Sequence, residues 1–346
     1  MSFLDNIIKQ SGNEYASIVE GGIESDINGF IDTGSYAFNA LLSGSIYGGI
    51  PDNKILALAG EQATGKTFFS IGVVKAFLES NPDAVVLYFD SEQAVTSDMF
   101  KDRGVDPSRI AVFPVDTVEN FRQQAFKIIE GIEKTDKADR KPTMMVLDSL
   151  GMLPTNKEVA DIADGKNVRD MTRAQLVKST FRVLTLKLGQ VGIPMIMTNH
   201  TYDVVGAYVP TKEMSGGSGL KYAASTIVYL SKRKDKDGTD IVGNLIRCKL
   251  FKGRLTKENS EVTVQLNYKT GLNKYYGLVD FAVAAGVFEK VSTSIKLPDG
   301  KTAFEKQINN DPEKYFTKSV MQELEKAVEK EFKYGKVPDV TDEGEE

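Results

Sequence analysis

The stretch Gly60-Glu61-Gln62-Ala63-Thr64-Gly65-Lys66-Thr67 fits the pattern G-x-x-x-x-G-K-[ST] of a phosphate-binding loop. The apolar run Ile55–Ala59 before it predicts a buried strand, and residues 68–79 after it predict a helix. Strand, glycine loop and helix in this order are the context that the motif requires. The stretch therefore predicts an α/β fold that binds a nucleotide, with a chance glycine-rich turn as the alternative.

Each part of this loop has a physical role in holding phosphate. Backbone N–H groups at the start of the helix favour an anion, and Gly60 and Gly65 let the backbone approach oxygen atoms closely. Lys66 supplies a positive charge to the outer phosphates, and the Thr67 hydroxyl can ligate Mg²⁺. We expect the loop, with Phe68 beside it, to bind the cofactor.

Composition places the chain among globular proteins of a reducing compartment. Its 346 residues suffice for one large α/β domain and a smaller one, at about 100–200 residues per domain. The single cysteine, Cys248, excludes an internal disulfide, and we find neither a signal peptide nor an apolar run of membrane-spanning length. The net charge of -5 disfavours DNA binding through bulk charge, but leaves open a groove assembled from several subunits.

Two further buried strands are predicted to end in carboxylates. Residues 84–89 run into Asp90-Ser91-Glu92, and residues 143–147 run into Asp148. In parallel α/β sheets the chemistry collects at the carboxyl ends of the strands. Asp148 fits the Walker B pattern, whose carboxylate supports Mg²⁺. Glu92 could polarise a water aimed at the terminal phosphate, or it could be a helix-capping or surface carboxylate.

The only histidine, His200, follows a predicted strand at residues 194–198. A lone histidine is often structural, but a place at a strand end beside the phosphate suits a sensor or switch. After it comes a long connection, residues 202–219, with Tyr202, Val204, Val205 and Tyr208 before Gly216-Gly217. Such a loop suits stacking on nucleic-acid bases or insertion between them, and a mobile lid or disordered loop is the alternative.

Other segments leave alternatives open. Ser2 and Asp5 predict a capping box for a short helix whose apolar stripe, Phe3, Ile7 and Ile8, packs either on its own core or on a neighbouring subunit. Residues 154–170 are predicted to be a polar connection, and residues 171–188 a helix. Lys252 and Arg254 are expected on one face of a strand, where they suit an anion or an exposed strand end.

Together these residues resemble the RecA/Rad51 recombinase family, and within it the UvsX-type recombinases of tailed phages. The resemblance covers about residues 33–280. Besides the loop, it rests on the motifs Thr33-Gly34-Ser35, Phe89-Asp90-Ser91-Glu92, Leu147-Asp148-Ser149, Asn199-His200-Thr201, Gly216-Gly217 with Leu220-Lys221-Tyr222, and Lys252-Gly253-Arg254.

The resemblance implies an α/β fold. Its RecA-like P-loop NTPase core, with a mainly parallel central sheet, would be joined to an N-terminal helix and a small α+β C-terminal domain. The expected divisions are an oligomerisation helix and linker at 1–32, the ATPase core at 33–272, the C-terminal domain at 273–335 and an acidic disordered tail at 336–346.

The same resemblance implies the roles of the site residues. Lys66 and Thr67 would bind the phosphates and Mg²⁺ of ATP, Asp148 would support the metal, and Glu92 would activate water. His200 would sense the γ-phosphate, and Lys252 and Arg254 would reach ATP across a subunit interface. The adenine would meet Met99, where the family has an aromatic residue, and Tyr268.

The connections 154–170 and 202–219 resemble the two DNA-binding loops of the family. The DNA-binding residues implied are Arg169, Arg173, Tyr202, Val204, Val205, Tyr208, Gly216 and Gly217. Lys221 and Tyr222 match interface residues. The N-terminal helix, with Phe3 and Ile7, matches a segment that packs on the neighbouring subunit.

The expected function is that of an ATP-dependent DNA recombinase. It would form a helical filament on single-stranded DNA, pair it with a homologous duplex and hydrolyse ATP, aided by single-strand-binding and mediator proteins. It would act in the cytoplasm, that of the host cell if a phage encodes it, and not at a membrane. The alternative is a related ATPase that acts as a ring helicase or as a regulator.

Overall fold

The computed structural model describes residues 2–13, 15–23, 25–166, 172–203, 212–215 and 218–335. The chain divides into two compact units, Met1–Asp32 with Ile50–Ser231 and Thr33–Gly49 with Lys232–Glu346. Each unit is described by itself. The domain divisions expected from the sequence stay predictions.

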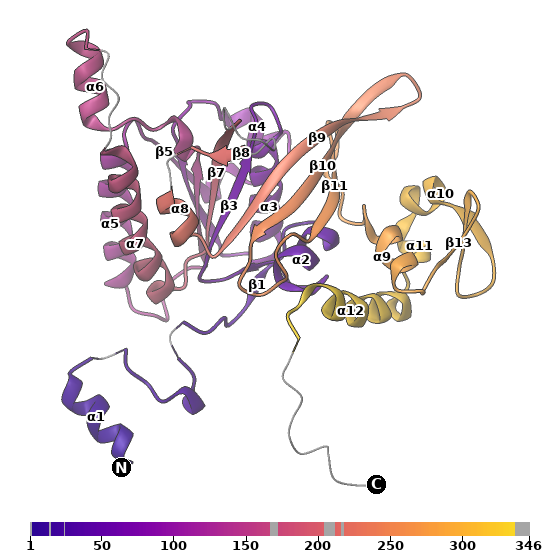
Figure 1. The fold of residues 1–346 in the computed structure, drawn as a ribbon, viewed down its shortest axis with the longest axis horizontal. Helices are drawn as coiled ribbons and strands as arrows, with labels where there is room; N and C mark the ends of the chain where they lie inside the picture. Colours follow the sequence, from indigo (N-terminus) through magenta and orange to yellow (C-terminus); the bar gives the residue numbers. More distant parts are fainter. Residues whose placement is uncertain are drawn as a thin grey trace. The chain divides into compact units, whose positions relative to one another are not determined.

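A central sheet of parallel strands organises the first unit (Figure 1). Its strands are β3 (Ile55–Gly60), β4 (Val85–Asp90), β5 (Ile110–Pro114), β6 (Thr143–Asp148), β7 (Met195–Asp203) and the beginning of β9 (Thr226–Asp237), in the order β9-β3-β7-β6-β4-β5. The pairs β3–β7, β3–β9, β4–β5, β4–β6 and β6–β7 are all parallel. Their carboxyl ends therefore lie at one edge of the sheet, as the mainly parallel fold requires.

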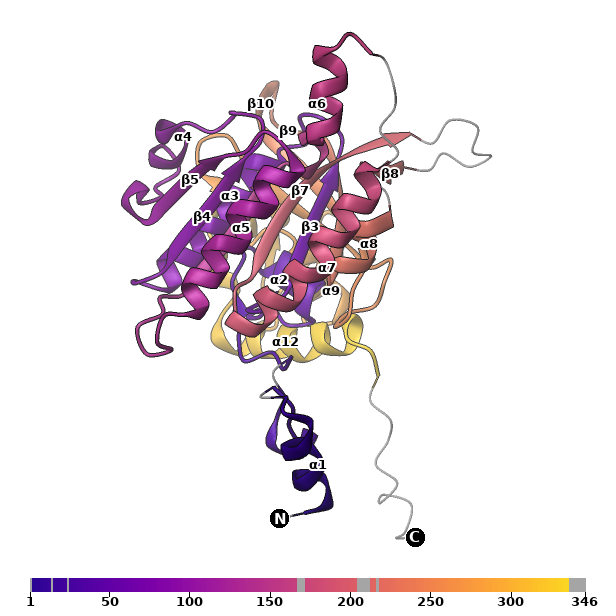
Figure 2. The same ribbon diagram turned by 90° about the vertical axis from the view of Figure 1, so that its left-hand side faces the viewer.

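Helices cover both faces of these strands (Figures 1 and 2). Helix α3 (Lys66–Ser80) lies on one face, and α5 (Val118–Glu133), α7 (Arg173–Val191) and α8 (Ser218–Ala223) lie on the other. The smaller elements of this unit are α1 (Phe3–Ser11), η1 (Val19–Gly21), β1 (Phe30–Ile31), β2 (Ile50–Pro51), α4 (Ser97–Lys101), η2 (Pro107–Arg109), η3 (Leu150–Met152), α6 (Asn156–Ala163) and β8 (Lys212–Met214).

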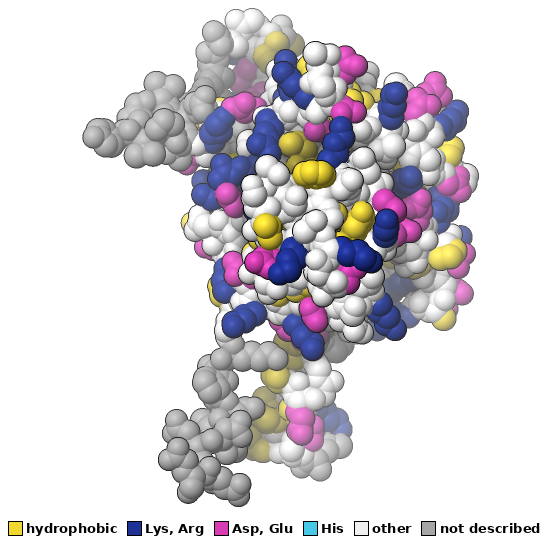
Figure 3. Space-filling model, turned by 90° about the vertical axis from the view of Figure 1, so that its right-hand side faces the viewer, with side chains coloured by type: hydrophobic (Ala, Val, Ile, Leu, Met, Phe, Trp, Pro, Cys, Tyr) yellow, Lys and Arg dark blue, Asp and Glu magenta, His cyan; other side chains and the backbone are white. Residues whose placement is uncertain are grey.

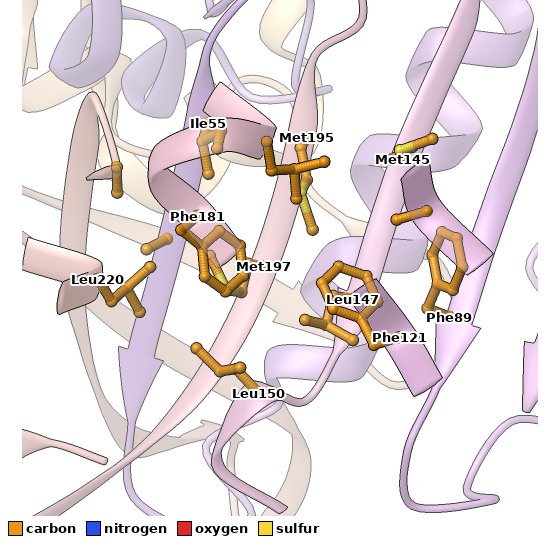
Figure 4. Packing of buried hydrophobic residues seen from close by; sticks show 14 of the residues in the cluster. Ile55, Phe89, Phe121, Met145, Leu147, Leu150, Phe181, Met195, Met197 and Leu220 are labelled. Carbon is orange, nitrogen blue, oxygen red and sulfur yellow. The ribbon is translucent and has the colours of Figure 1, made fainter. Parts of the chain in front are cut away.

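The core of the first unit forms where the alternate side chains of the strands meet α5, α7 and α8. Figure 4 shows Met145 and Leu147 of β6 and Met195 and Met197 of β7 among the aromatic rings. The rings of Phe121 and Phe181 stack with centroids 6.1 Å apart. Burial of these side chains stabilises the sheet by about 25 cal/mol for each Å² of apolar surface removed from water. A rigid sheet holds the polar groups at its edge in fixed positions.

The second unit is built from antiparallel strands and short helices. Strand β9 continues into a hairpin with β10 (Asp240–Lys252), followed in the sheet by β11 (Glu261–Asn267) and β12 (Gly271–Leu272). The remaining elements are α2 (Tyr36–Ser43), α9 (Leu278–Ala284), β13 (Glu289–Val291), β14 (Ser294–Lys296), β15 (Thr302–Phe304), α10 (Glu305–Asn310), α11 (Pro312–Tyr315) and α12 (Lys318–Phe332). Asp299-Gly300 lies in the turn that joins β14 to β15 as an antiparallel hairpin, where Gly300 has a φ of 82°.

Several predicted elements are confirmed, and others are wrong. The capping box of Ser2 and Asp5 begins α1 as predicted. The stretch 154–170 is not simply a polar connection, because α6 begins there with a capping box between Thr155 and Glu158. The long connection also carries structure, since β8 pairs antiparallel with the end of β7 and α8 follows it. β5 and α5 were not predicted; β5 is a partly exposed edge strand with a weak apolar pattern.

Two corrections change the site. Strand β7 extends to Asp203, five residues beyond the predicted end, so His200 lies inside a strand and not after one. Strand β10 ends at Lys252, so strand alternation does not place Arg254 on the same face. None of the helices within the described residues combines the length and apolar composition that crossing a bilayer would need.

Candidate nucleotide site

The loop between β3 and α3 has the backbone of a phosphate cradle. A Cβ atom on Gly60 would lie 2.8 Å from Thr64 Oγ1 and 2.9 Å from the carbonyl oxygen of Leu230, so only glycine fits there. Gly65 has a φ of 90° and begins α3 without a side-chain hydrogen bond to the helix. The first N–H groups of α3 are therefore available to an anion, which the dipole of the helix also favours.

Lys66 is a buried cation inside this loop. Its residue is 7% exposed, and its Nζ donates to the carbonyl oxygens of Gly60 at 3.0 Å and Glu61 at 2.9 Å. Burial lowers the pKa of Lys66, although the charges of Asp148 and Glu92 oppose that shift. A buried ammonium beside uncapped N–H groups fits the phosphates of a nucleotide.

Asp148 ends β6 as a buried carboxylate that is held on both sides. It is 5% exposed, and its Oδ2 accepts a hydrogen bond from the Tyr88 hydroxyl at 2.8 Å. Its Oδ1 accepts a second hydrogen bond from the hydroxyl of Thr198 on β7. With the Thr67 hydroxyl, this carboxylate provides the oxygen donors that Mg²⁺ prefers, so the residues present fit a nucleotide-bound magnesium ion.

Glu92 lies just past β4 in a hydrogen-bonded group with Ser149 and His200. The Ser149 hydroxyl donates to Glu92 Oε1 at 2.7 Å, and His200 Nε2 lies 3.1 Å from the same oxygen. Burial alone would raise the pKa of Glu92, but these hydrogen bonds and the charges of His200 and Lys66 outweigh it and lower the pKa. Glu92 is therefore ionised near neutral pH, as a general base must be.

Asp90 fixes the backbone that carries Glu92. Its Oδ1 accepts hydrogen bonds from the N–H groups of Glu92 at 3.0 Å and Ala94 at 3.4 Å, and its Oδ2 accepts one from Val95 at 3.4 Å. Asp90 is opposite Asp148 in the register of β4 and β6. The end of β4 thus holds the turn that carries Glu92, while the end of the neighbouring strand β6 carries Asp148.

The end of β7 joins this site to β8. The carbonyl oxygen of His200 accepts a hydrogen bond from the N–H of Ser215 at 2.9 Å, and Asn199 Nδ2 donates to the carbonyl oxygen of Ser215 at 2.7 Å. Lys212 on β8 also forms an ion pair with Glu61 of the phosphate loop. The two strands that flank residues 204–211, β7 and β8, therefore both contact the site.

The residues predicted to meet the adenine are placed in different surroundings. Met99 is half-buried on α4, whereas its neighbour Phe100 is buried edge-on against the Tyr88 ring, with centroids 5.6 Å apart. Phe68 carries the Arg103 guanidinium 4.6 Å above its ring. Tyr268 is exposed and belongs to the second unit. Their roles toward a base stay predictions.

Lys252 and Arg254 lie in the second unit, at and just past the end of β10. Burial lowers the pKa of Lys252, and the charge of Arg254 lowers it further, so the two cations are close neighbours. We expected strand alternation to place both on one face, but β10 ends at Lys252 and the chain bends at Arg254. Two adjacent cations remain suited to an anion.

Of the residues predicted to bind DNA, Arg173 forms hydrogen bonds within the chain. Its guanidinium donates to the carbonyl oxygens of Leu153 at 3.0 Å, Leu150 at 3.1 Å and Gly151 at 3.3 Å, and its side chain is 16% exposed. These hydrogen bonds connect the start of α7 to the segment that follows β6. Tyr202 is exposed near the end of β7, whereas Arg169, Val204, Val205, Tyr208, Gly216 and Gly217 lie outside the described residues, as does the acidic tail.

The predicted interface residues have polar or exposed surroundings. Phe3 and Ile7 are 78% and 46% exposed, and no residue of α1 is buried. Lys221 on α8 forms an ion pair with Glu213 at 3.5 Å. Tyr222 is 69% exposed, and Lys178 Nζ lies 5.7 Å from the centre of its ring.

Sequence reasoning missed the residues that support the predicted ones. Tyr88, Thr198, Ser149 and Asp90 all hold Asp148 or Glu92 through hydrogen bonds. A signal was present, because Tyr88 and Thr198 bring hydroxyls into runs of otherwise apolar residues. The contact itself depends on the strand order β7-β6-β4, which the sequence does not reveal.

Comparisons with known proteins agree with this geometry. The family model described as the RecA N-terminal domain matches residues 2–273. The "Recombination and repair protein" of Enterobacteria phage T4 is 36% identical over 252 residues, which span 73% of this chain and 63% of the phage protein. Protein RecA of Clavibacter michiganensis is 27% identical over 82% of this chain and 76% of its own length. Protein RecA of Malacoplasma penetrans is 24% identical over 93% of this chain and 96% of its own length. The chain therefore belongs to the RecA family.

Proposed function

We propose that this protein is an ATP-dependent DNA recombinase that forms a filament on single-stranded DNA and exchanges strands with a homologous duplex. The observation that carries the proposal is the convergence of Lys66, Asp148 and Glu92 at the carboxyl edge of one sheet, in a chain of the RecA family. A phage relative named for recombination and repair supports the same activity.

In this proposal the nucleotide site hydrolyses ATP, and most of its side chains come from one subunit. ATP would bring Mg²⁺, which neutralises phosphate charge when bound. The N–H groups of α3 and the Lys66 ammonium bind the phosphates, while Thr67 and Asp148 hold the metal. Glu92 orients water and accepts its proton, and Ser149 and His200 keep the carboxylate in place. Lys252 and Arg254 would come from the next subunit.

DNA would bind through the connections on either side of α6 and β8, aided by Tyr202. Figure 3 shows the face opposite to that of Figure 2, where Lys and Arg side chains are interspersed with Asp and Glu side chains and apolar residues form small separate spots. Such a face does not attract a polyanion through charge of one sign. Because the net charge of the whole chain is -5, bulk charge does not favour DNA either, and apolar insertion and main-chain N–H groups have to supply more of the binding.

A strand-exchange assay tests this function directly. Single-stranded DNA, ATP and Mg²⁺ would be mixed with the full chain and a labelled duplex, either homologous or of unrelated sequence. A recombinase transfers the labelled strand only from the homologous duplex. Nucleotide-dependent strand separation that ignores homology would instead indicate a helicase and overturn the proposal.

Self-association is proposed to use α1. Three apolar residues of this helix, Phe3, Leu4 and Ile7, are exposed, and full burial of such a side chain on a partner is worth about 1.5–3 kcal/mol. We expect Ile7→Asp to reduce filament assembly by about tenfold or more, because a carboxylate would enter that contact. Sedimentation with ATP and single-stranded DNA measures this effect, with Lys9→Asp as a control on the same helix. Unchanged assembly in Ile7→Asp would contradict the role of α1.

A further inference from the structure

The hydroxyl of Tyr88 lies in a hydrophobic core whose packing does not require a polar atom there. Tyr88 is fully buried on β4, and its ring packs edge-on against Phe100 of α4 at 5.6 Å. A phenylalanine would fill the same volume. The oxygen atom therefore adds one thing to the core, which is a hydrogen bond of 2.8 Å to Asp148 Oδ2.

Thr198 does the same from the opposite side. It lies on β7 and is fully buried, and its hydroxyl donates to Asp148 Oδ1. Since β6 lies between β4 and β7, the two hydroxyls hold the carboxylate from its two neighbouring strands. Each carboxylate oxygen has two lone pairs, so each keeps one for a metal ion or for its bound water.

The carboxylate also has a competing attraction. The charges of Asp148 and Lys66 act on one another, and both residues are buried. Without donors on either side, the carboxylate could rotate toward the ammonium, and each ion would then be less available to Mg²⁺ and phosphate. Burial and Asp148 also keep the pKa of Tyr88 well above its usual value, so the phenol remains a donor.

We infer that Tyr88 and Thr198 are positioning residues for magnesium, which orient the Asp148 carboxylate so that it binds the metal of the nucleotide complex. This inference rests on the proposed nucleotide site. It assigns to Tyr88 a function that a merely structural core residue would lack. Residues that hydrogen-bond to a metal ligand typically alter metal affinity by about 10–100-fold when they are substituted.

The test uses the full chain and a fluorescent ADP analogue that is not hydrolysed. Binding of the analogue is titrated in EDTA and at increasing Mg²⁺ concentrations for the parent, Tyr88→Phe and Thr198→Val. We expect equal affinity in EDTA and a rise of about tenfold or more in the Mg²⁺ concentration for half-maximal enhancement of binding in each variant. Tyr276→Phe is the matched control, because it removes the hydroxyl of a partly buried tyrosine that interacts with Arg233 in the second unit.

The outcomes separate this inference from the proposed function. If the parent binds the analogue with Mg²⁺ and Tyr88→Phe requires the same Mg²⁺ concentration, Tyr88 is only a core residue and the inference fails. A parent that binds no nucleotide overturns the proposed function, and the inference with it. If Tyr88→Phe melts early, Thr198→Val decides the question, because the same shift is expected from the other side of the carboxylate.

Discussion

The two strand-end carboxylates of the candidate site have opposite surroundings. Asp148 is buried and held by hydroxyls from two neighbouring strands, whereas Glu92 is partly exposed and held by Ser149 and His200. We call the first group, with Lys66, Tyr88 and Thr198, the inner layer. The second, in which Glu92 and His200 are partly exposed and Ser149 and Asn199 are buried behind them, is the outer layer.

The difference matches two different tasks. Groups that hold a metal and phosphates gain from burial, because electrostatic interactions are stronger where water is excluded. A group that activates water needs access to water and a partner that responds to the result. In the proposed function the inner layer therefore binds the nucleotide complex, and the outer layer hydrolyses ATP and communicates the result to β8.

The largest expected effect separates binding from hydrolysis. Glu92→Gln keeps the shape of the outer layer but removes the base, so we expect the rate of ATP hydrolysis to fall by about 10²–10⁴-fold. Nucleotide affinity, which the inner layer sets, would change little. Steady-state hydrolysis with single-stranded DNA and analogue binding measure the two quantities. Glu79→Gln on α3 is the control, and equal hydrolysis rates for the parent and Glu92→Gln would refute the role of Glu92.

A smaller effect is expected on communication within the outer layer. The His200 side chain contacts Glu92, and its backbone contacts Ser215 near β8. We expect His200→Ala to bind nucleotide but to lose most of the increase in DNA affinity that ATP produces, where couplings of about 5–150-fold are typical.

Fluorescence anisotropy of a labelled single strand, with and without a non-hydrolysable ATP analogue, measures this coupling. His200→Gln restores a hydrogen-bond donor and is expected to recover part of it. The sensor role would be disproved by a His200→Ala protein whose DNA affinity still rises with nucleotide as in the parent.

The smallest effect concerns pH. The Ser149 hydroxyl stabilises the ionised form of Glu92 and helps to lower its pKa. Ser149→Ala therefore raises that pKa, and the acid limb of the hydrolysis profile should move to higher pH, with a plateau within about twofold of the parent. Ser80→Ala on α3 is the control for a lost hydroxyl.

The same shift predicts a change in stability. A carboxylate with a lowered pKa stabilises the fold above its unfolded pKa, and this contribution is lost as pH falls through the folded pKa. In Ser149→Ala that contribution is smaller, so the acid-dependent loss of stability should shrink. Superimposable acid limbs in the rate profiles would show that Ser149 does not act on Glu92.

The sequence by itself determined the elements with strong local signals. The phosphate loop, the strands before it and at Asp148, and the helix that begins at Phe3 follow from glycine spacing, apolar runs and capping residues. Local signals suffice there because a phosphate cradle and a helix cap are made by residues close in the chain. Edge strand β5 lacked such a signal, and so did the extension of β7.

Only the tertiary structure decided which polar groups meet. Tyr88 and Asp148 are 60 residues apart, and Glu92 and His200 are 108 apart. Their contacts depend on the order and register of parallel strands, which are set by packing against α5 and α7 and not by local sequence. For the same reason Arg173, a candidate DNA contact from its position in the chain, binds carbonyl oxygens of its own subunit. The residue types indicated the chemistry of this site, and long-range packing determined which residues position its functional groups.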